Sequence, residues 1–207
     1  MVTLVTTIGK GSMDFYVRKL AENLDVPKLH TDIYQRIAER FNIPIFCPAA
    51  LKACWQDWRF VTRLNKLDGI VHLPNQHFAR YALFLRNPFV VTVHDLVRCC
   101  FAVARETITE RLFIRLDIRY IKRASHIIAV SRNTRDDLIK YLKIPDDKIS
   151  VIYNGIDHSI FKPYNIKVLD EPYILYVGSE RPRKNLGRLF DAFAKLKPEF
   201  SELKLVK

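Results

Sequence analysis

A histidine ends one of the most apolar segments of the sequence. His94 comes directly after PFVVTV, a run of residues typical of a buried strand. An imidazole in this position could donate a hydrogen bond to a sugar hydroxyl or to a developing anion, or titrate near neutral pH. The alternative is a strand-end histidine that bonds only to the backbone. His94 is therefore the first candidate for chemistry.

A loop rich in cations comes just before a helical pattern near the end of the chain. GSERPRKN (178–185) contains Arg181, Arg183 and Lys184, and LGRLFDAFAKL follows it. Cations at a helix N-terminus oppose the helix dipole. An anionic ligand such as a diphosphate would relieve that cost and use the free N–H groups of the first turn. A solvated basic loop is the alternative.

A second loop, IGKGS (8–12), places two glycines between a predicted strand and a predicted helix. Gly11 and Ser12 would allow backbone N–H groups to approach a phosphate at the helix N-terminus. The loop lacks the third glycine of the dinucleotide-binding pattern, so a flexible turn is the alternative. The six histidines show no spacing that would place two metal ligands on one element, and we expect no metal site.

Strands and helices alternate along the chain, which predicts a mostly parallel sheet with helices on both faces, a Rossmann-like α/β fold. The predicted strands cover 2–8, 43–46, 69–74, 88–96, 125–131 and 148–153. The predicted helices are one that Ser12 could cap, 30–41, 50–67, a short one in 75–85, 105–124, and one that Ser131 caps.

Ligands of such sheets bind beyond the carboxyl ends of the strands. The loops to watch are therefore IGKGS, LPNQH, HDL, AVSRN and YNGID, which all follow predicted strands. Ser131, Asn154 and Gly155 lie in the last two loops. We interpret them as candidate residues of a ligand-binding cleft.

The pattern restarts after Pro163. Residues 163–172 are polar and aperiodic, and we interpret them as a linker between a first domain over 1–162 and a second pattern over 173–207. The second pattern contains a strand, a helix and the start of another strand. About 40 residues are too few for a domain that stands alone, so this segment is expected to be the start of an incomplete second Rossmann-like domain.

The formal net charge of +12 favours a polyanionic partner, such as an anionic membrane surface or a phosphorylated substrate. A solvated basic surface is the alternative. Nucleic-acid binding would rest on charge alone, since no module signature is present, and we do not expect it. No apolar run is long enough to span a bilayer and no signal peptide is recognisable. We expect a cytoplasmic protein whose four cysteines are free thiols.

Three stretches taken together resemble the retaining glycosyltransferases of family 4, which have the GT-B fold. They are VVTVHDL, ASHIIAVSRNTRDDLIKYLKIPDDKISVIYNGIDHSIFKP and YILYVGSERPRKNLGRLFDAFAKL, in the order and spacing of the family. The resemblance implies two Rossmann-like domains facing each other across a cleft. The first would bind mainly the acceptor and the second mainly the nucleotide-sugar donor. Gly155 would take a positive φ and turn the chain toward the linker.

The resemblance also implies roles for individual residues. His94 matches the family histidine that lies beside the transferred sugar. Gly11 and Ser12 match the glycine-rich loop that approaches the donor phosphates, and Lys184 matches the lysine that neutralises the diphosphate.

One position departs from the family pattern. The family commonly has an arginine after the glycine of the second-domain loop, whereas Ser179 follows Gly178 here. Arg181 or Arg183 would then take the place of that arginine.

The implied reaction moves a sugar, such as mannose or glucose, from a nucleotide-diphosphate sugar to a saccharide or lipid-linked acceptor with retention. It would need no metal or other cofactor, because cations and helix N-termini stabilise the leaving diphosphate. The paired glutamates of the family have no counterpart here, so a truncated enzyme with little activity is expected. The competing hypothesis is a non-catalytic basic module that binds an anionic membrane surface, at which the protein would lie peripherally, or a partner chain.

Overall fold

The computed structural model describes residues 1–7, 11–31, 58–97, 108–163, 169–180 and 182–207. The chain forms two compact units, Met1–Gly155 and Ile156–Lys207. The finer division, with a linker over 163–172, stays a prediction. All four cysteines lie outside the described residues. None of the helices formed by the described residues is both long and apolar enough to cross a membrane.

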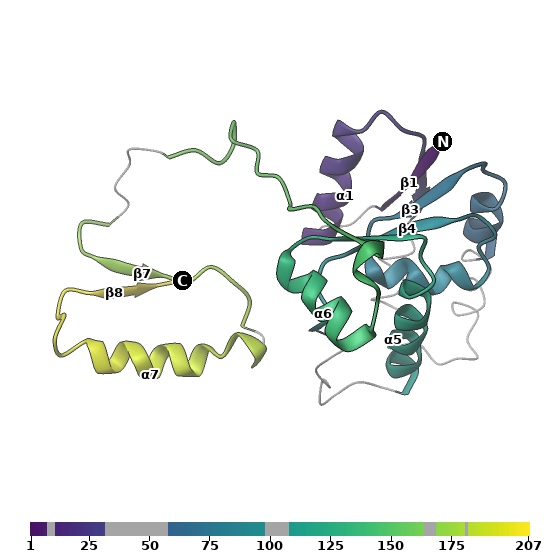
Figure 1. The fold of residues 1–207 in the computed structure, drawn as a ribbon. Coiled ribbons are helices and arrows are strands. Elements are labelled where there is room, and N and C mark those ends of the chain that lie inside the picture. The colour runs from purple at the N-terminus through teal and green to yellow at the C-terminus, as the bar shows by residue number, and fades with distance from the viewer. Residues whose placement is uncertain (8–10, 32–57, 98–107, 164–168, 181) are drawn as a thin grey trace, which may run out of the picture. The chain divides into compact units, whose positions relative to one another are not determined.

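A six-stranded sheet forms the centre of the first unit (Figure 1). Its strands run parallel in the order β2-β1-β3-β4-β5-β6. They are β1 (Val2–Thr7), β2 (Lys28–Thr31), β3 (Ile70–Leu73), β4 (Phe89–Val93), β5 (His126–Ala129) and β6 (Ile149–Val151). The predicted α/β Rossmann-like fold is confirmed.

The helices of this unit connect successive strands. They are α1 (Ser12–Asn23), α5 (Ile108–Ile121), α6 (Arg132–Leu142) and the two 3-10 helices η1 (Gln76–Leu83) and η2 (Asp146–Lys148). Residues 58–64 are also helical. Two details differ from the predictions. Gly11, not Ser12, occupies the N-cap position of α1, and the short helix after β3 is a 3-10 helix.

One strand was missed by the sequence patterns. β2 (Lys28–Thr31) pairs with β1, although a helix was predicted to start at His30. Only Leu29 and Thr31 of this strand are buried, and four residues are too few to reveal a two-residue period. The rest of that predicted helix and the predicted strand over 43–46 lie outside the described residues.

The two faces of the sheet are covered differently. A single hydrophobic cluster buries one face and contains Val5, Leu73 and Val91 of the strands together with buried side chains of η1, α5 and α6. α1 packs on the other face, where Leu4 and Val17 are buried outside that cluster. Burial of each such side chain stabilises the fold by about 1.5–3 kcal/mol. Packing on both faces therefore holds the carboxyl ends of the strands in fixed positions.

Ser131 caps α6, as predicted, because its Oγ accepts the backbone N–H of Thr134 at 3.1 Å. Replacing Ser131 with alanine leaves that N–H without its partner. The free energy of unfolding should fall by about 1 kcal/mol, measured by urea denaturation. Ser125→Ala is the matched control, since Ser125 is exposed and caps none of the described helices. Equal unfolding midpoints for the two variants would contradict the capping role.

The second unit contains a strand–helix–strand arrangement. β7 (Tyr173–Leu175) and β8 (Lys204–Val206) pair in parallel, and α7 (Leu186–Leu196) connects them and lies alongside them in Figure 1. A 3-10 turn, η3 (Pro182–Lys184), precedes α7. The predicted order of a strand, a cation-bearing loop, a helix and a second strand is confirmed for this segment.

Candidate functional site

The sheet topology indicates where the first unit would bind a ligand. The chain passes from β1 to β2 on one side and then returns to β3 on the other side, so the strand order reverses between β1 and β3. Ligands of open α/β sheets bind beyond the carboxyl ends of the strands at such a switch point. The described segments that leave this edge include the N-terminus of α1, the turn after β3 and the segment after β4, which begins with His94.

His94 is fixed through three of its polar atoms. Its backbone N–H donates to Gln76 Oε1 at 3.1 Å, and its carbonyl oxygen accepts from Thr134 Oγ1 at 3.1 Å. The ring Nε2 lies 3.0 Å from the carbonyl oxygen of Pro74. A carbonyl oxygen can only accept, so Nε2 carries the hydrogen. In the neutral ring, the lone pair on Nδ1 is left for a ligand.

Burial favours this neutral form. Desolvation lowers the pKa of His94, and the charge of a protonated His77 would lower it further. The bond to Pro74 and the Asp95 carboxylate raise the pKa but do not cancel the effect of burial. At neutral pH the ring is therefore an acceptor through Nδ1 rather than a cation.

We expect His94 to show the Nε2–H tautomer at pH 7 in ¹⁵N–¹H NMR spectra of histidine-labelled protein. Its titration midpoint should lie below the usual histidine value of about 6.5, because burial penalises the charged ring. A midpoint at or above that value, or a mixture of tautomers at pH 7, would contradict this assignment.

Tyr16 of α1 packs its ring against that of His94, with the centroids 4.9 Å apart and the planes at 87°. The Tyr16 hydroxyl is hydrogen-bonded to Thr92 of β4, and burial raises the pKa of Tyr16. Thr92 Oγ1 in turn lies 2.9 Å from Nε2 of the buried His72. These contacts join α1, β3 and β4 on the α1 face of the sheet, next to His94.

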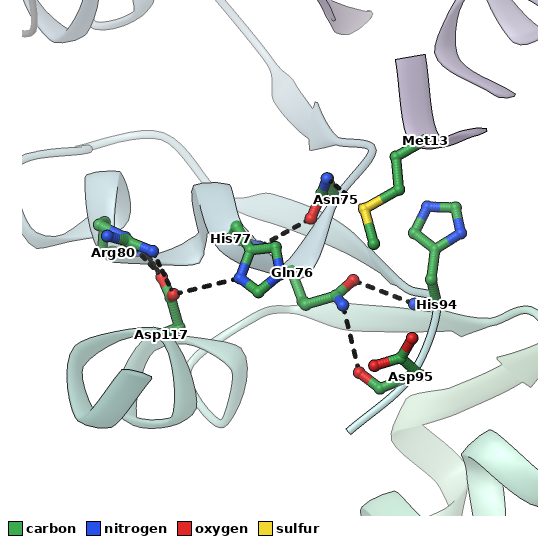
Figure 2. Close-up of polar contacts among 8 residues, drawn as sticks. All are labelled: Met13, Asn75, Gln76, His77, Arg80, His94, Asp95 and Asp117. Atoms are coloured by element: carbon green, nitrogen blue, oxygen red, sulfur yellow. Dashed lines mark hydrogen bonds and ion pairs between the residues drawn. The ribbon is translucent and has the colours of Figure 1, made fainter. Parts of the chain in front are cut away.

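The turn after β3 is held from two sides (Figure 2). Asn75 Oδ1 accepts the backbone N–H of His77 at 2.9 Å and so caps η1, while Asn75 Nδ2 lies 2.8 Å from Met13 Sδ of α1. One turn further along η1, the Arg80 guanidinium makes two bonds to the buried carboxylate of Asp117 in α5, at 2.9 and 2.6 Å. The turn is thus anchored to α1 and, through η1, to α5.

The glycine-rich loop is less open to an anion than its sequence indicates. The Gly11 N–H donates to Asp14 Oδ2 at 3.1 Å, and Thr7 Oγ1 donates to Asp14 Oδ1 at 2.7 Å. The Asp14 side chain is buried in the first turn of α1, and Ser12 is exposed beside it. Asp14 already occupies the Gly11 donor, so the phosphate-binding role of Gly11 and Ser12 stays a prediction.

The three candidates after β5 and β6 differ in their connection to His94. Ser131 Oγ lies 2.9 Å from Thr134 Oγ1, and Thr134 Oγ1 donates to the His94 carbonyl oxygen. Thr134 therefore links Ser131 to His94 through two hydrogen bonds. Asn154 and Gly155 follow β6 and are exposed. The expectation of a positive φ at Gly155 is wrong: among the described glycines only Gly69 has one. A side chain at Gly155 would meet no atom within 4 Å.

The cationic candidates belong to the second unit. Lys184 is exposed at the end of η3, directly before the N-cap of α7. That N-cap, Asn185, makes no side-chain capping bond, and the first turn of α7 contains no acidic residue. Arg183 belongs to η3, but its side chain, like the whole of Arg181, lies outside what the structure describes. Anion binding here stays a prediction.

Three residues of the site were not singled out by the sequence patterns, namely Tyr16, Asn75 and Gln76. Asn75 and Gln76 lie in the loop LPNQH, whose one distinguishing feature in the sequence is that it follows a predicted strand. Their bonds reach His77, α1 and the segment after β4, and the bonds to the last two span 62 and 18 residues of the chain. In the described residues, no group of three or more His, Cys, Asp or Glu side chains could hold a metal ion.

The chain is similar to a curated relative and to solved structures. The chain is 32% identical over 103 residues to the O-antigen chain mannosyltransferase RfbU of Salmonella typhimurium, which covers 49% of this chain and 27% of that relative. Crystal structures of Anabaena Alr3699/HepE with UDP and with UDP-glucose have TM-scores of 0.65 and 0.68 at 16% and 20% identity. They cover 100% and 99% of this chain, and 69% and 59% of their own chains, and they show the shared GT-B fold.

The matched segment thus spans about a quarter of the length of that curated relative. The match to the family itself is broader, because residues 2–160 fit the description of Glycosyltransferase Family 4. This range contains His94, the capped start of α6 and the YNGID segment. The chain belongs to glycosyltransferase family 4.

Proposed function

We propose that this chain contains the acceptor-side domain, and the beginning of the donor-side domain, of a retaining glycosyltransferase. The observation that carries the proposal is His94, held at the end of β4 by three hydrogen bonds that leave Nδ1 for a ligand. Nucleotide sugars are supported as donors because the solved neighbours are complexes with UDP and UDP-glucose. For the acceptor we propose a saccharide or a lipid-linked molecule, as the family resemblance implies, and the relative is an O-antigen chain mannosyltransferase.

Candidate residues in each unit are assigned one role in such a transfer. The neutral His94 ring accepts a hydrogen bond from a sugar hydroxyl through Nδ1 and so orients the transferred sugar. Lys184, with Arg181 or Arg183 and the N–H groups at the start of α7, neutralises the departing diphosphate. We propose that the transfer proceeds with retention and without a metal or another cofactor, as the family resemblance implies.

Ligand binding is the activity to measure first, because the chain spans 69% and 59% of its solved neighbours. The histidine NMR signals should be followed while UDP-glucose or GDP-mannose is added. The His94 signals should shift, whereas those of His126, at the amino end of β5, should stay in place. Unchanged His94 signals with both nucleotide sugars would overturn the proposal. Turnover of labelled sugar by the same chain would show that these residues suffice for catalysis.

One surface observation favours the second candidate function, contact with an anionic membrane. The Trp58 ring packs edge-on against Phe84 with centroids 5.9 Å apart, and the two side chains are 56% and 53% exposed. Asn65 joins the two segments, since its side chain bonds to the Phe84 carbonyl oxygen and to the Arg86 N–H. Exposed Arg63, Lys66 and Arg86 belong to the same segments. Exposed aromatic rings beside cations suit a membrane–water interface.

Flotation with lipid vesicles tests this surface. The protein should bind vesicles that contain phosphatidylglycerol more strongly than vesicles of phosphatidylcholine, and salt should weaken the binding. Replacing both Trp58 and Phe84 with serine should reduce flotation. Tyr141→Ser, which removes an exposed aromatic ring from α6, is the matched control. Equal flotation of the double variant and the control would exclude this surface as the membrane contact.

A further inference from the structure

We propose that Gln76 is a positioning residue that sets the placement of His94. The proposal rests on the proposed function, because it assigns to Gln76 an effect on the group that would contact the sugar. Gln76 is the first residue of η1, is 3% exposed, and is separated from His94 by 18 residues of chain. It touches no reacting atom itself and acts through the segment after β4.

The Gln76 amide bonds to two consecutive residues of that segment (Figure 2). Its Oε1 accepts the His94 N–H at 3.1 Å, and its Nε2 donates to the Asp95 carbonyl oxygen at 3.2 Å. The amide thus fixes the backbone on both sides of the His94 Cα. Only a side chain with both a donor and an acceptor can make this pair of bonds. A side chain of the same length that lacked either group would leave a backbone polar atom unpaired.

The ring of His94 depends on the same turn. Its Nε2–H donates to the carbonyl oxygen of Pro74, two residues before Gln76. The turn therefore holds both the backbone and the imidazole of His94. A shift of Gln76 would change the direction in which Nδ1 points as well as the position of the strand end. A displacement of about 1 Å at a reacting group can cost two orders of magnitude in rate.

The structure also explains why Gln76 stays in place. Asn75 caps η1 through the His77 N–H, and Arg80 ties η1 to the buried Asp117 of α5. Gln76 thus lies between a capped helix start and a buried ion pair, on a helix that cannot rotate without breaking one of them. The position of His94 is set by a rigid helix start rather than by a free loop, as a precise binding group requires.

The test uses the chain without any ligand, so that its result does not depend on the proposed function. Gln76→Met keeps the length of the side chain and removes both hydrogen bonds. We expect the His94 backbone amide to exchange with solvent at least about tenfold faster. The ring should also lose its single Nε2–H tautomer, and its pKa should rise toward the usual value as burial decreases.

Asn87→Leu is the matched control. The Asn87 amide bonds to the carbonyl oxygens of Leu67 and Gly69 at the amino ends of the strands, and its loss should leave the His94 signals unchanged. If Gln76→Met leaves the exchange, tautomer and pKa of His94 as they are in Asn87→Leu, the proposal is overturned.

A second measurement covers the case in which Gln76→Met does not fold. In the unmodified chain, the side-chain NH₂ protons of Gln76 should exchange more slowly than those of exposed amides, because one of them bonds to Asp95. Rapid exchange of these protons would equally overturn the proposal. A positive result here with unchanged His94 signals on addition of nucleotide sugars would support the role of Gln76 while rejecting the proposed function.

Discussion

Replacing Arg80 with leucine should lower the free energy of unfolding by about 3–5 kcal/mol, because it leaves the Asp117 carboxylate buried without its counter-ion. The Asp117 side chain is 4% exposed and accepts three bonds from Arg80, from the backbone N–H, Nε and a terminal guanidinium nitrogen, at 3.1, 2.9 and 2.6 Å. The other ring nitrogen near this carboxylate among the described contacts, His77 Nδ1, lies 3.7 Å away. It cannot replace a bidentate guanidinium.

Urea denaturation followed by circular dichroism measures this loss, and a double-mutant cycle separates its causes. Arg80→Leu combined with Asp117→Leu removes both charges, so the stability of this double variant should be closer to that of the unmodified chain than the stability of either single variant. Arg135→Leu is a control of the same geometry. Arg135 also makes a bidentate pair, with Asp146 at 2.7 and 2.6 Å, but the two side chains are 33% and 59% exposed, far more than those of the Arg80–Asp117 pair. This control should unfold near the unmodified midpoint. Equal losses in Arg80→Leu and Arg135→Leu would show that burial does not decide the effect.

The Arg80 variant also connects stability to the site. Arg80 and Asp117 hold η1 against α5, and Gln76 at the start of η1 bonds to the His94 backbone. If η1 is loosened without unfolding the chain, the His94 amide should lose protection in the folded state. The buried pair would then act on the site through the helix that it fixes, without contact with a ligand.

The part of the fold that the sequence predicts is the part that local patterns encode. The buried run before His94, the cap at Ser131 and the alternation of strands and helices all depend on residues within a few positions of each other. The strand β2 escaped prediction because its identity depends on pairing with β1, which no window of four residues reveals. The placement of η1 likewise depends on a distant contact, since Arg80 bonds to Asp117 of α5, which is 37 residues away.

The candidate site shows the same limit. His94 could be found because its strand is apolar and its own side chain is chemically distinctive. Gln76 is an ordinary amide in a polar loop, and only the fold brings it to the end of β4. The predictions for Gly11 and Gly155 were based on the backbone conformations and close contacts that glycine allows. The structure instead shows Gly11 bonded to Asp14 and Gly155 without a positive φ.

Acid should destabilise the chain through His72. This side chain is 8% exposed in β3, and burial lowers its pKa to about 4. In the unfolded chain its pKa returns to about 6.5. As the pH falls from 7 toward 4, the unfolded state takes up a proton that the folded state does not. The stability that His72 contributes above pH 6.5 is therefore lost as the pH falls toward 4, and the loss approaches about 3 kcal/mol.

His72→Gln isolates this contribution, because glutamine can keep a hydrogen bond to Thr92 but does not titrate. Free energies of unfolding should be compared at pH 7, 5.5 and 4.5. All carboxylates, and His94 with its lowered pKa, titrate in both proteins, so their effects cancel in the difference. At pH 7 the unmodified chain should be at least as stable as the variant, and the difference should move in favour of the variant as the pH falls. Parallel curves would mean that His72 takes up its proton over the same pH range in the folded and unfolded states, and that its bond to Thr92 does not require a neutral ring.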